Sequence, residues 1–307
     1  MRYTIFLLAF LAFSFSAFSE KRQIKAVQIE TIELPDNIRV KSYKLNSSGN
    51  LIVFSTLGTN DLKAYDITTK KLFGLPSGAS LNTTVLSSDD NQLFYTETVI
   101  NVGQKEKQLI AFSLSTGKSR VITEETIEQA KRWNWWYRLW NKEKRKLAET
   151  DFVALKNGAL SVPYIYLKEG QLVYNGGESE KILNPLEAKY YLHPSLSPDK
   201  TKICGFAVGK GAFVCDTDGG NVVKLGNMEA PAWVNNKLVA GMITSDDGHN
   251  INSSEIKIID IETLESKLVL PAEHKGMYPT AIPDKNQIIC TTPEGQLILV
   301  EYITEDL

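Results

Sequence analysis

The prediction of the fold depends most on the octapeptide His193-Pro194-Ser195-Leu196-Ser197-Pro198-Asp199-Lys200. It joins an extended segment to a tight polar turn, and the β-rich run Ile203-Cys204-Gly205-Phe206 follows directly. This order is a β-hairpin signal, because Pro, Asp and Ser favour a turn between two strands. Looser copies of the phrase start near Leu45, Leu86 and Tyr278, so the chain repeats one structural unit.

The copies recur at intervals that fit about 40 residues per unit, which is typical of propeller blades. Gly49 and Asp89 lie 40 residues apart, and Asp199 and Asp284 lie 85 apart, which is two units. Asp89 and Asp199 lie 110 apart, which is two units plus 25 residues. The spacing therefore predicts an all-β, six-bladed β-propeller with one insertion. The predicted blades lie near residues 38–75, 80–123, 150–185, 190–226, 230–270 and 277–304.

A second recurring phrase has apolar residues, an Asp and then a turn, as at Asp66, Asp216 and Asp260. It predicts the third strand, the turn and the fourth strand of a four-stranded blade. The last blade shows only three strands, and the segment Ile24–Leu34 alternates like a half-buried strand. We expect this segment to supply the missing strand and close the ring, which would bury an exposed sheet edge.

The insertion predicted between blades two and three, residues 124–148, contains four of the five tryptophans. A helix over Ile127–Lys146 would bring Trp133, Trp136, Tyr137 and Trp140 to one side. Such a stripe fits three roles: packing on the propeller, binding a partner, or contacting a membrane surface through residues 131–146. We take Trp133, Trp135, Trp136, Tyr137 and Trp140 as the candidate partner-binding residues.

The N-terminus has a charged start at Arg2, an apolar run from Thr4 to Phe15 and a small-residue exit at Ser16–Ser19. This pattern predicts a secretory signal peptide over residues 1–19, followed by a single propeller domain over residues 20–307. The alternative is an uncleaved anchor, although the apolar run is shorter than the roughly 20 residues of a membrane span. No Cys follows the run, so lipoprotein attachment is not expected. We expect a periplasmic or secreted protein.

The charge balance gives no argument for nucleic-acid binding. The whole chain has 34 basic and 36 acidic residues, and removing residues 1–19 takes away only Arg2, which leaves a net charge of −3. The hydrophobic content of 43% suits a large buried core. We expect a monomer.

The three cysteines are Cys204, Cys215 and Cys290. A two-residue turn at Gly209-Lys210 would place Cys204 directly opposite Cys215, where a disulfide is possible in an oxidising compartment. The interpretation that we favour is that both are small buried apolar residues, as free cysteines often are.

No sequence motif for catalysis or for a cofactor stands out. The three histidines, His193, His249 and His274, fall in different predicted blades without metal-ligand spacing. His193 occupies a repeat position that Ala230 and Tyr278 also fill, which favours a structural role. There is no nucleophile elbow, phosphate loop or His-Glu-x-x-His motif. The acidic loop with Asp246, Asp247 and His249 is the remaining ligand-binding candidate, and no cofactor or catalytic metal is expected.

These repeats resemble those of TolB-type six-bladed propellers of bacterial periplasms. The resemblance is strongest from His193 to Lys200 and in the stretch Ala212–Gly220, which ends Asp216-Thr217-Asp218-Gly219-Gly220. Lys200 stands where the family pattern has Gly. Related blades also occur in prolyl-oligopeptidase-type enzymes, but we expect no counterpart of their hydrolase domain in this chain. We also expect no counterpart of the N-terminal α/β domain of TolB.

The resemblance implies a propeller fold and two alternative functions. The first is a non-catalytic binding or scaffolding propeller that meets a protein partner in the cell envelope or outside the cell. The second is a propeller enzyme, such as a metal-dependent lyase or a lactonase, with its site at the central channel. Fold similarity alone supports either function.

Overall fold

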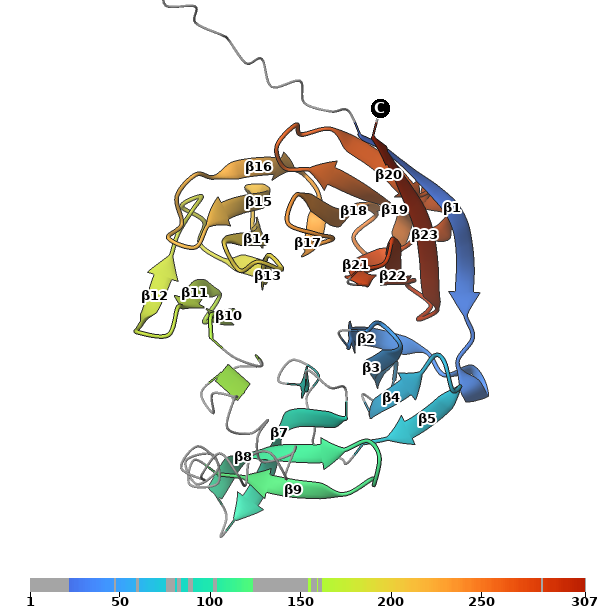
Figure 1. The fold of residues 1–307 in the computed structure, drawn as a ribbon, viewed down its shortest axis with the longest axis vertical. Coiled ribbons are helices and arrows are strands. Elements are labelled where there is room, and N and C mark those ends of the chain that lie inside the picture. Colours follow the sequence, from blue (N-terminus) through green and yellow to red (C-terminus); the bar gives the residue numbers. More distant parts are fainter. Residues whose placement is uncertain are drawn as a thin grey trace, which may run out of the picture.

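The structure is a computed structural model that describes residues 22–46, 48–58, 61–75, 81, 84–87, 91–101, 104–123, 154–155, 159, 162–282 and 284–306. Its strands form six antiparallel sheets arranged as the blades of a ring (Figure 1). The predicted six-bladed all-β propeller is therefore confirmed. The predicted helical insertion at residues 124–148 lies outside the described residues.

Blades one and two follow the N-terminal strand, and each has four strands in sequential order. A one-turn 3-10 helix at Pro35–Asn37 precedes blade one. The strands are β2 (Val40–Leu45), β3 (Leu51–Thr56), β4 (Leu62–Asp66) and β5 (Lys71–Gly74), then β6 (Val85–Leu86), β7 (Gln92–Asn101), β8 (Gln104–Ser113) and β9 (Ser119–Ile122).

Blades three, four and five follow, with three described strands in the first and four in each of the others. The strands are β10 (Tyr164–Lys168), β11 (Gln171–Asn175), β12 (Glu180–Leu183), β13 (Tyr191–Leu196), β14 (Lys202–Ala207), β15 (Gly211–Asp216), β16 (Val223–Gly226), β17 (Glu229–Trp233), β18 (Leu238–Asp246), β19 (Ile251–Asp260) and β20 (Ser266–Leu270).

Blade six closes the ring in the way that the alternation of residues 24–34 predicts. After a 3-10 helix at Ala272–His274 it has β21 (Met277–Ile282), β22 (Gln287–Thr291) and β23 (Leu297–Asp306). Its fourth and outermost strand is β1 (Arg22–Ile32), which pairs antiparallel with β23 from Arg22 opposite Asp306 to Ile32 opposite Leu297. The first and last strands among the described residues therefore share one sheet.

Blade three matches the other blades once its turns are aligned with theirs. The Tyr191 amide donates to the Gly170 carbonyl at 2.8 Å, as the Val40 amide donates to the Gly295 carbonyl at 2.8 Å. Gly295 lies between the second and third strands of blade six. Gly170, between β10 and β11, holds the same place, so β10, β11 and β12 are the second, third and fourth strands of their blade.

Side chains within the repeated hairpin phrase stabilise its turns. The Ser197 hydroxyl accepts a hydrogen bond from the Lys202 amide at 3.0 Å, the Ser87 hydroxyl from the Gln92 amide at 2.9 Å, and the Asn46 amide oxygen from the Leu51 amide at 2.9 Å. Each bond spans five residues, so the residue that starts the turn also ties its far end. This local bond explains why Ser or Asn recurs there.

The core lies between neighbouring blades rather than at one centre. Tyr191 and Phe213 of blade four pack with Leu172 of blade three, and their rings meet edge to face at 5.8 Å. Cys204 of blade four packs with Val239 of blade five. Burying apolar surface on both faces of each sheet stabilises a blade only when its neighbours are present.

The structure corrects the predicted geometry of Cys204 and Cys215. Three residues, 208–210, connect β14 to β15, and Ala207 pairs with Gly211, so Cys204 lies opposite Val214 and Cys215 opposite Ile203. One extra loop residue shifts the register by one and sends the two thiols to opposite faces of the sheet. Cys204, Cys215 and Cys290 are all free and buried, as the favoured interpretation predicts.

Candidate functional site

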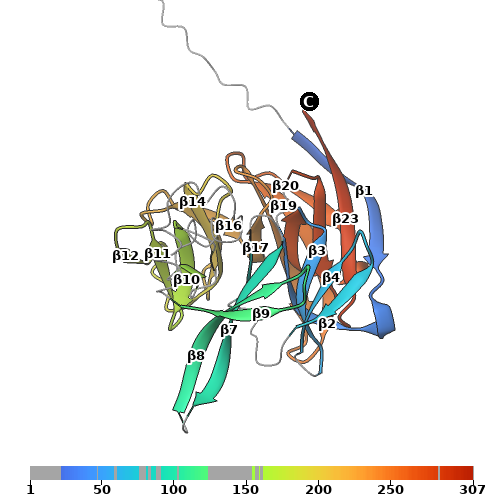
Figure 2. The ribbon, with the colours of Figure 1, turned by 60° about the horizontal axis from the view of Figure 1, so that its bottom comes forward.

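The two faces of the ring carry different turns. We call the face where the innermost strands begin the hairpin face, because it bears the turns between second and third strands, including the long β7–β8 and β18–β19 hairpins. We call the opposite side the turn face, because the innermost strands end there in their tight first turns. Figure 2 shows the β7–β8 hairpin projecting beyond the ring on one side and the β1–β23 pair extending on the other.

The acidic loop predicted as a ligand candidate lies at the hairpin face, between β18 and β19, and its carboxylates serve the turn itself. Asp246 Oδ1 accepts the Gly248 amide at 2.9 Å. Asp247 Oδ1 accepts the amides of Asn250 at 2.7 Å and His249 at 2.9 Å, and these bonds, Asn250 first, lower the pKa of Asp247. Asp246, Asp247 and His249 are all exposed, which is typical of a solvated loop.

The predicted partner-binding residues Trp133, Trp135, Trp136, Tyr137 and Trp140 lie outside the described residues. The described chain before them ends with Ile122 of β9 and Thr123. A fourth strand runs from the turn face to the hairpin face, so the chain leaves blade two at the hairpin face.

The structure brings together two residues that sequence reasoning treated as structural. His193, Ala230 and Tyr278 start the innermost strands of blades four, five and six, and each precedes a proline. All three adopt left-handed backbone angles, with φ of 49°, 46° and 53°. Each lies in a β-bulge, which turns its side chain out of the regular alternation. The ring of His193 contacts that of Tyr278.

Carboxylate and tyrosine groups surround this pair. Glu229 accepts a hydrogen bond from the Thr244 hydroxyl at 3.0 Å, and its charge raises the pKa of His193. Partial desolvation of the imidazole outweighs that effect, so the pKa of His193 is lowered overall. Tyr43 donates to the Tyr278 carbonyl at 2.8 Å. The X-Pro pair that recurs in these three blades was the sequence signal for His193, Ala230 and Tyr278 as equivalent positions.

An exposed apolar cluster lies beside the pair on the hairpin face. Tyr190, Leu192 and Val208 keep 45%, 43% and 45% of their surface exposed. Their backbones are adjacent, because the Val208 amide donates to the Tyr190 carbonyl at 3.0 Å and Leu192 pairs with Phe206, two residues before Val208. The Lys189 ammonium lies 5.1 Å from the Tyr190 ring centroid. We call Tyr190, Leu192 and Val208 the blade-four cluster.

Lys44 is a partly buried lysine that the sequence analysis missed. Its ammonium donates to the Thr84 carbonyl at 2.8 Å and so joins the innermost strands of blades one and two. Burial lowers its pKa to about 8. The sequence repeat contained a signal for it, because a long charged side chain stands at a position where the other blades have small uncharged ones. Those residues are Val85, Ser195, Ala232 and Thr280.

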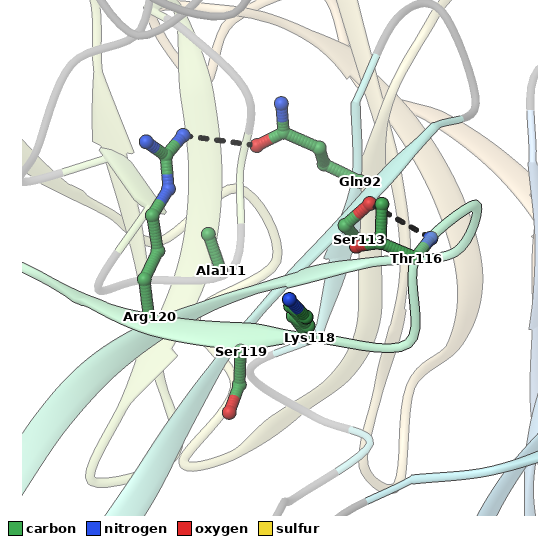
Figure 3. Close-up of a pocket in the computed structure, with 7 residues that line it drawn as sticks. All are labelled: Gln92, Ala111, Ser113, Thr116, Lys118, Ser119 and Arg120. Atoms are coloured by element: carbon green, nitrogen blue, oxygen red, sulfur yellow. Dashed lines mark hydrogen bonds between the residues drawn. The ribbon is translucent and has the colours of Figure 1, made fainter.

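A cavity of about 750 Å³ opens on the turn face against blades four, five and six. A second, small pocket of about 150 Å³ lies on blade two and is drawn in Figure 3. There the Arg120 guanidinium donates to the Gln92 amide oxygen at 3.5 Å, while Ser119 points away from them (Figure 3). Lys118 and Arg120 could attract a small anion there, but both are exposed and screened by solvent.

Within the described ranges, no group of three or more His, Cys, Asp or Glu side chains is placed to hold a metal ion. His193, His249 and His274 do not form one site. Nor does the described part of the chain contain a helix with the length and apolar character of a membrane span.

Comparison with known proteins defines the class as a six-bladed β-propeller. No protein-family model matches the sequence, and no curated protein matches it. An oligogalacturonate lyase from Vibrio parahaemolyticus superposes with a TM-score of 0.52 and 11% identity, over 92% of this chain and 98% of that chain. This likeness shows the fold alone.

Two further solved structures are similar at lower scores. A putative TolB from Agrobacterium tumefaciens matches with a TM-score of 0.49 and 12% identity, over 93% of this chain and 99% of that one. TolB from Acinetobacter baumannii matches with a TM-score of 0.46 and 15% identity, over 77% of this chain and 55% of that one.

Proposed function

We propose that the chain is a non-catalytic binding propeller whose hairpin face docks a protein partner. One observation carries the proposal, namely the uneven distribution of exposed apolar side chains. Of the 13 large hydrophobic residues that stay exposed among the described residues, Leu57, Ile100, Tyr190, Leu192, Val208 and Tyr278 lie on the hairpin face. Leu264 lies on the turn face, Ile303 lies on the third strand of blade six, and the others lie on the outermost strands of their blades.

The chemistry of this face suits a protein surface. Tyrosine is enriched among residues that dominate binding energy, and Tyr190 and Tyr278 lie here beside aliphatic neighbours. The blade-four cluster forms an apolar centre with Lys189 at its edge. A polar rim around an apolar centre is the usual composition of a protein interface.

The tryptophan-rich segment extends the proposal. The chain leaves blade two at the hairpin face, and residues 124–148 follow directly. We propose that Trp133, Trp136, Tyr137 and Trp140 add to the same docking surface. Replacing Trp136 and Trp140 by Ala then abolishes partner binding and leaves thermal stability nearly unchanged. A large loss of melting temperature with binding intact would instead show that these residues pack as core.

We further propose that the protein is exported and works in the periplasm or outside the cell. The support is the N-terminal pattern of Arg2, an apolar run and small residues. N-terminal sequencing of the exported protein tests it, with a start near Glu20 expected. A start at Met1 in that fraction would contradict cleavage.

The docking proposal is tested with two double variants of equal chemistry. Leu192→Lys with Val208→Lys places two charges in the blade-four cluster. Val121→Lys with Ile182→Lys places two charges on outer strands, at residues that are 50% and 66% exposed. Both variants should keep the wild-type melting temperature, because all four side chains are exposed.

The variants are used as bait on a cell-envelope extract. We expect the wild type and the outer-strand variant to capture equal amounts of one partner. The blade-four variant should capture about tenfold less or lower still, which is the effect of losing one central interface residue. Equal capture by all three proteins would exclude the blade-four cluster as the docking site.

A further inference from the structure

The cavity on the turn face has walls from three blades. Trp233 of blade five and Tyr302 of blade six line it together with the tight turns that follow the innermost strands of blades four to six. Its volume, about 750 Å³, lies within the range of roughly 300–1,000 Å³ that small-molecule sites occupy. The hairpin-face surface lies at the opposite end of the innermost strands, so the cavity is a separate site.

Tyr302 supplies the observation that points to a ligand. Its side chain is 3% exposed, and its ring packs in the apolar core between blades five and six. Its backbone amide donates to the Asn286 carbonyl at 2.9 Å, and within the described residues its hydroxyl makes no hydrogen bond. Burial alone raises the pKa of this phenol to about 12, so the hydroxyl stays protonated and can donate.

This hydroxyl is not sealed inside the core. Among buried side-chain oxygens and nitrogens in the described part of the chain, only the Tyr95 hydroxyl is both sealed and without a partner. Tyr302 is one of the residues that line the cavity, and its hydroxyl is not among the sealed atoms, so a ligand in the cavity can reach it. A buried donor without a protein partner has a desolvation cost that a bound acceptor would remove.

The neighbouring amides are oriented by the turns and present donors. Asn235 Oδ1 accepts the amides of Lys237 at 2.8 Å and Leu238 at 2.9 Å. Asn236 Oδ1 accepts the amide of Asp199, across the blade boundary, at 3.0 Å. Backbone amides only donate, so these oxygens are assigned and each NH2 group remains as a donor for a ligand.

The remaining groups set the charge and shape of the ligand. The indole nitrogen of Trp233 already donates to the Ser195 carbonyl at 3.2 Å, so this half-buried side chain offers ring surface rather than a donor. The Lys285 ammonium donates to the Ser48 carbonyl at 3.2 Å, and the carboxylate of Asp284 beside it balances its charge. The cavity is therefore donor-rich, close to neutral and bounded by an aromatic ring.

We propose that this cavity binds an uncharged, flat ring compound that carries acceptor oxygens and few donors of its own. The ring lies against Trp233, since aromatic pairs prefer stacked or edge-to-face contact. An oxygen of the ligand accepts from Tyr302 and others accept from the NH2 groups of Asn235 and Asn236.

The test uses coumarin as a probe and naphthalene as its control, because both are flat bicyclic molecules and only coumarin carries oxygens. Binding to the full mature chain is followed by ligand-observed NMR. We expect saturable coumarin binding with a dissociation constant on the order of millimolar or tighter, given the size of the probe. We expect weaker binding of naphthalene.

Two tyrosine variants distinguish the loss of the hydroxyl at the cavity from the general effect of removing a buried hydroxyl. Tyr302→Phe removes only the hydroxyl and should weaken coumarin binding by roughly two- to tenfold, with the melting temperature kept. Tyr95→Phe removes the other unpaired buried hydroxyl, far from the cavity, and should leave coumarin binding unchanged. The blade-four double variant should also bind coumarin normally, which keeps this test independent of the docking proposal.

Any of the following four binding results would overturn the proposal, as would a fifth from competition. They are no saturable coumarin binding at millimolar concentration, equal binding of naphthalene, an unchanged affinity in Tyr302→Phe, and an equal loss in Tyr95→Phe. Competition by methyl glucoside, which is rich in donors, would also reject the proposed ligand class in favour of a saccharide.

Discussion

The rings of His193 and Tyr278 lie with their centroids 5.8 Å apart and their planes inclined by 47°, although they belong to blades four and six. Ala230 holds the equivalent position in blade five, between them. A methyl side chain leaves room for two rings to meet above it. Holding three non-glycine residues in the left-handed region costs on the order of 1 kcal/mol each, so the contact has a conformational cost.

His193 should titrate at lower pH than an ordinary histidine. Desolvation lowers its pKa, and the charge of Glu229 opposes the shift. In the window between the lowered folded pKa and the unfolded value of about 6.5, the unfolded chain binds more protons, so this residue makes the protein less stable as pH falls. An NMR titration, with the His193 signal assigned through His193→Asn, measures the midpoint.

The control for this titration is Glu229→Gln. It removes the neighbouring charge, so the midpoint of His193 should fall further. A midpoint above 6.5 in the wild type, or a rise in the variant, would contradict the electrostatic account.

Two glycines in matching turns should respond differently to alanine. Gly170 and Gly209 both lie between second and third strands, with φ of 81° and 76°. A Cβ at Gly209 meets nothing within 4 Å, so Gly209→Ala should cost about 1 kcal/mol of unfolding free energy for the left-handed backbone alone.

A Cβ at Gly170 lies 2.4 Å from Cδ1 of Tyr190, a member of the blade-four cluster. Gly170→Ala should therefore cost about 2–4 kcal/mol, because a steric clash adds to the backbone term. Urea denaturation measures both variants. Equal losses would mean that Tyr190 moves aside without cost.

Removing β1 should expose the edge of β23. Deleting residues 22–32 takes away ten paired positions, from Arg22 to Ile32, and leaves the β23 backbone groups open to another chain. We expect aggregation, measured by light scattering, while removal of residues 1–19 leaves the protein monodisperse. A monodisperse, folded deletion variant would show that blade six is stable with three strands.

The three thiols should be inert in the folded protein. Burial raises the pKa of Cys204, Cys215 and Cys290 to about 12 in each case, so the reactive thiolate is scarce near neutral pH. A colorimetric thiol reagent at pH 8 should find none in the native state and three after denaturation. Only one thiol after denaturation would show a disulfide and contradict the register of β14 and β15.

The sequence allowed the blades to be placed because each turn carries its own chemistry. Ser197, Ser87 and Asn46 bond within five residues, so local sequence reports the turn directly. The register of β14 and β15 was not predictable, because one residue more or less between Ala207 and Gly211 changes it. The ring contact of His193 with Tyr278 was not predictable either. The repeat shows that the two residues hold equivalent positions, but it does not show that their side chains meet.

The turn-face cavity was also invisible in the sequence. Tyr302 comes from a third strand, whereas Trp233 and Asn236 come from the blade before it. Only the packing of blade six against blade five brings them to one wall. The tryptophan-rich segment is the opposite case, because its composition is conspicuous in the sequence and it lies outside the described residues.

The pairing of β1 with β23 has a consequence for how the protein folds. Ile24 lies opposite Thr304, so the contact that completes the ring joins nearly the whole length of the chain. Contacts of such sequence separation form slowly, because the intervening chain must first be ordered or its loop entropy overcome. A ribosome makes β23 after the other described strands, so β1 stays unpaired until β23 emerges. During that interval the nascent chain holds an open strand at each end, and a chaperone that covers β1 would protect it until its partner emerges.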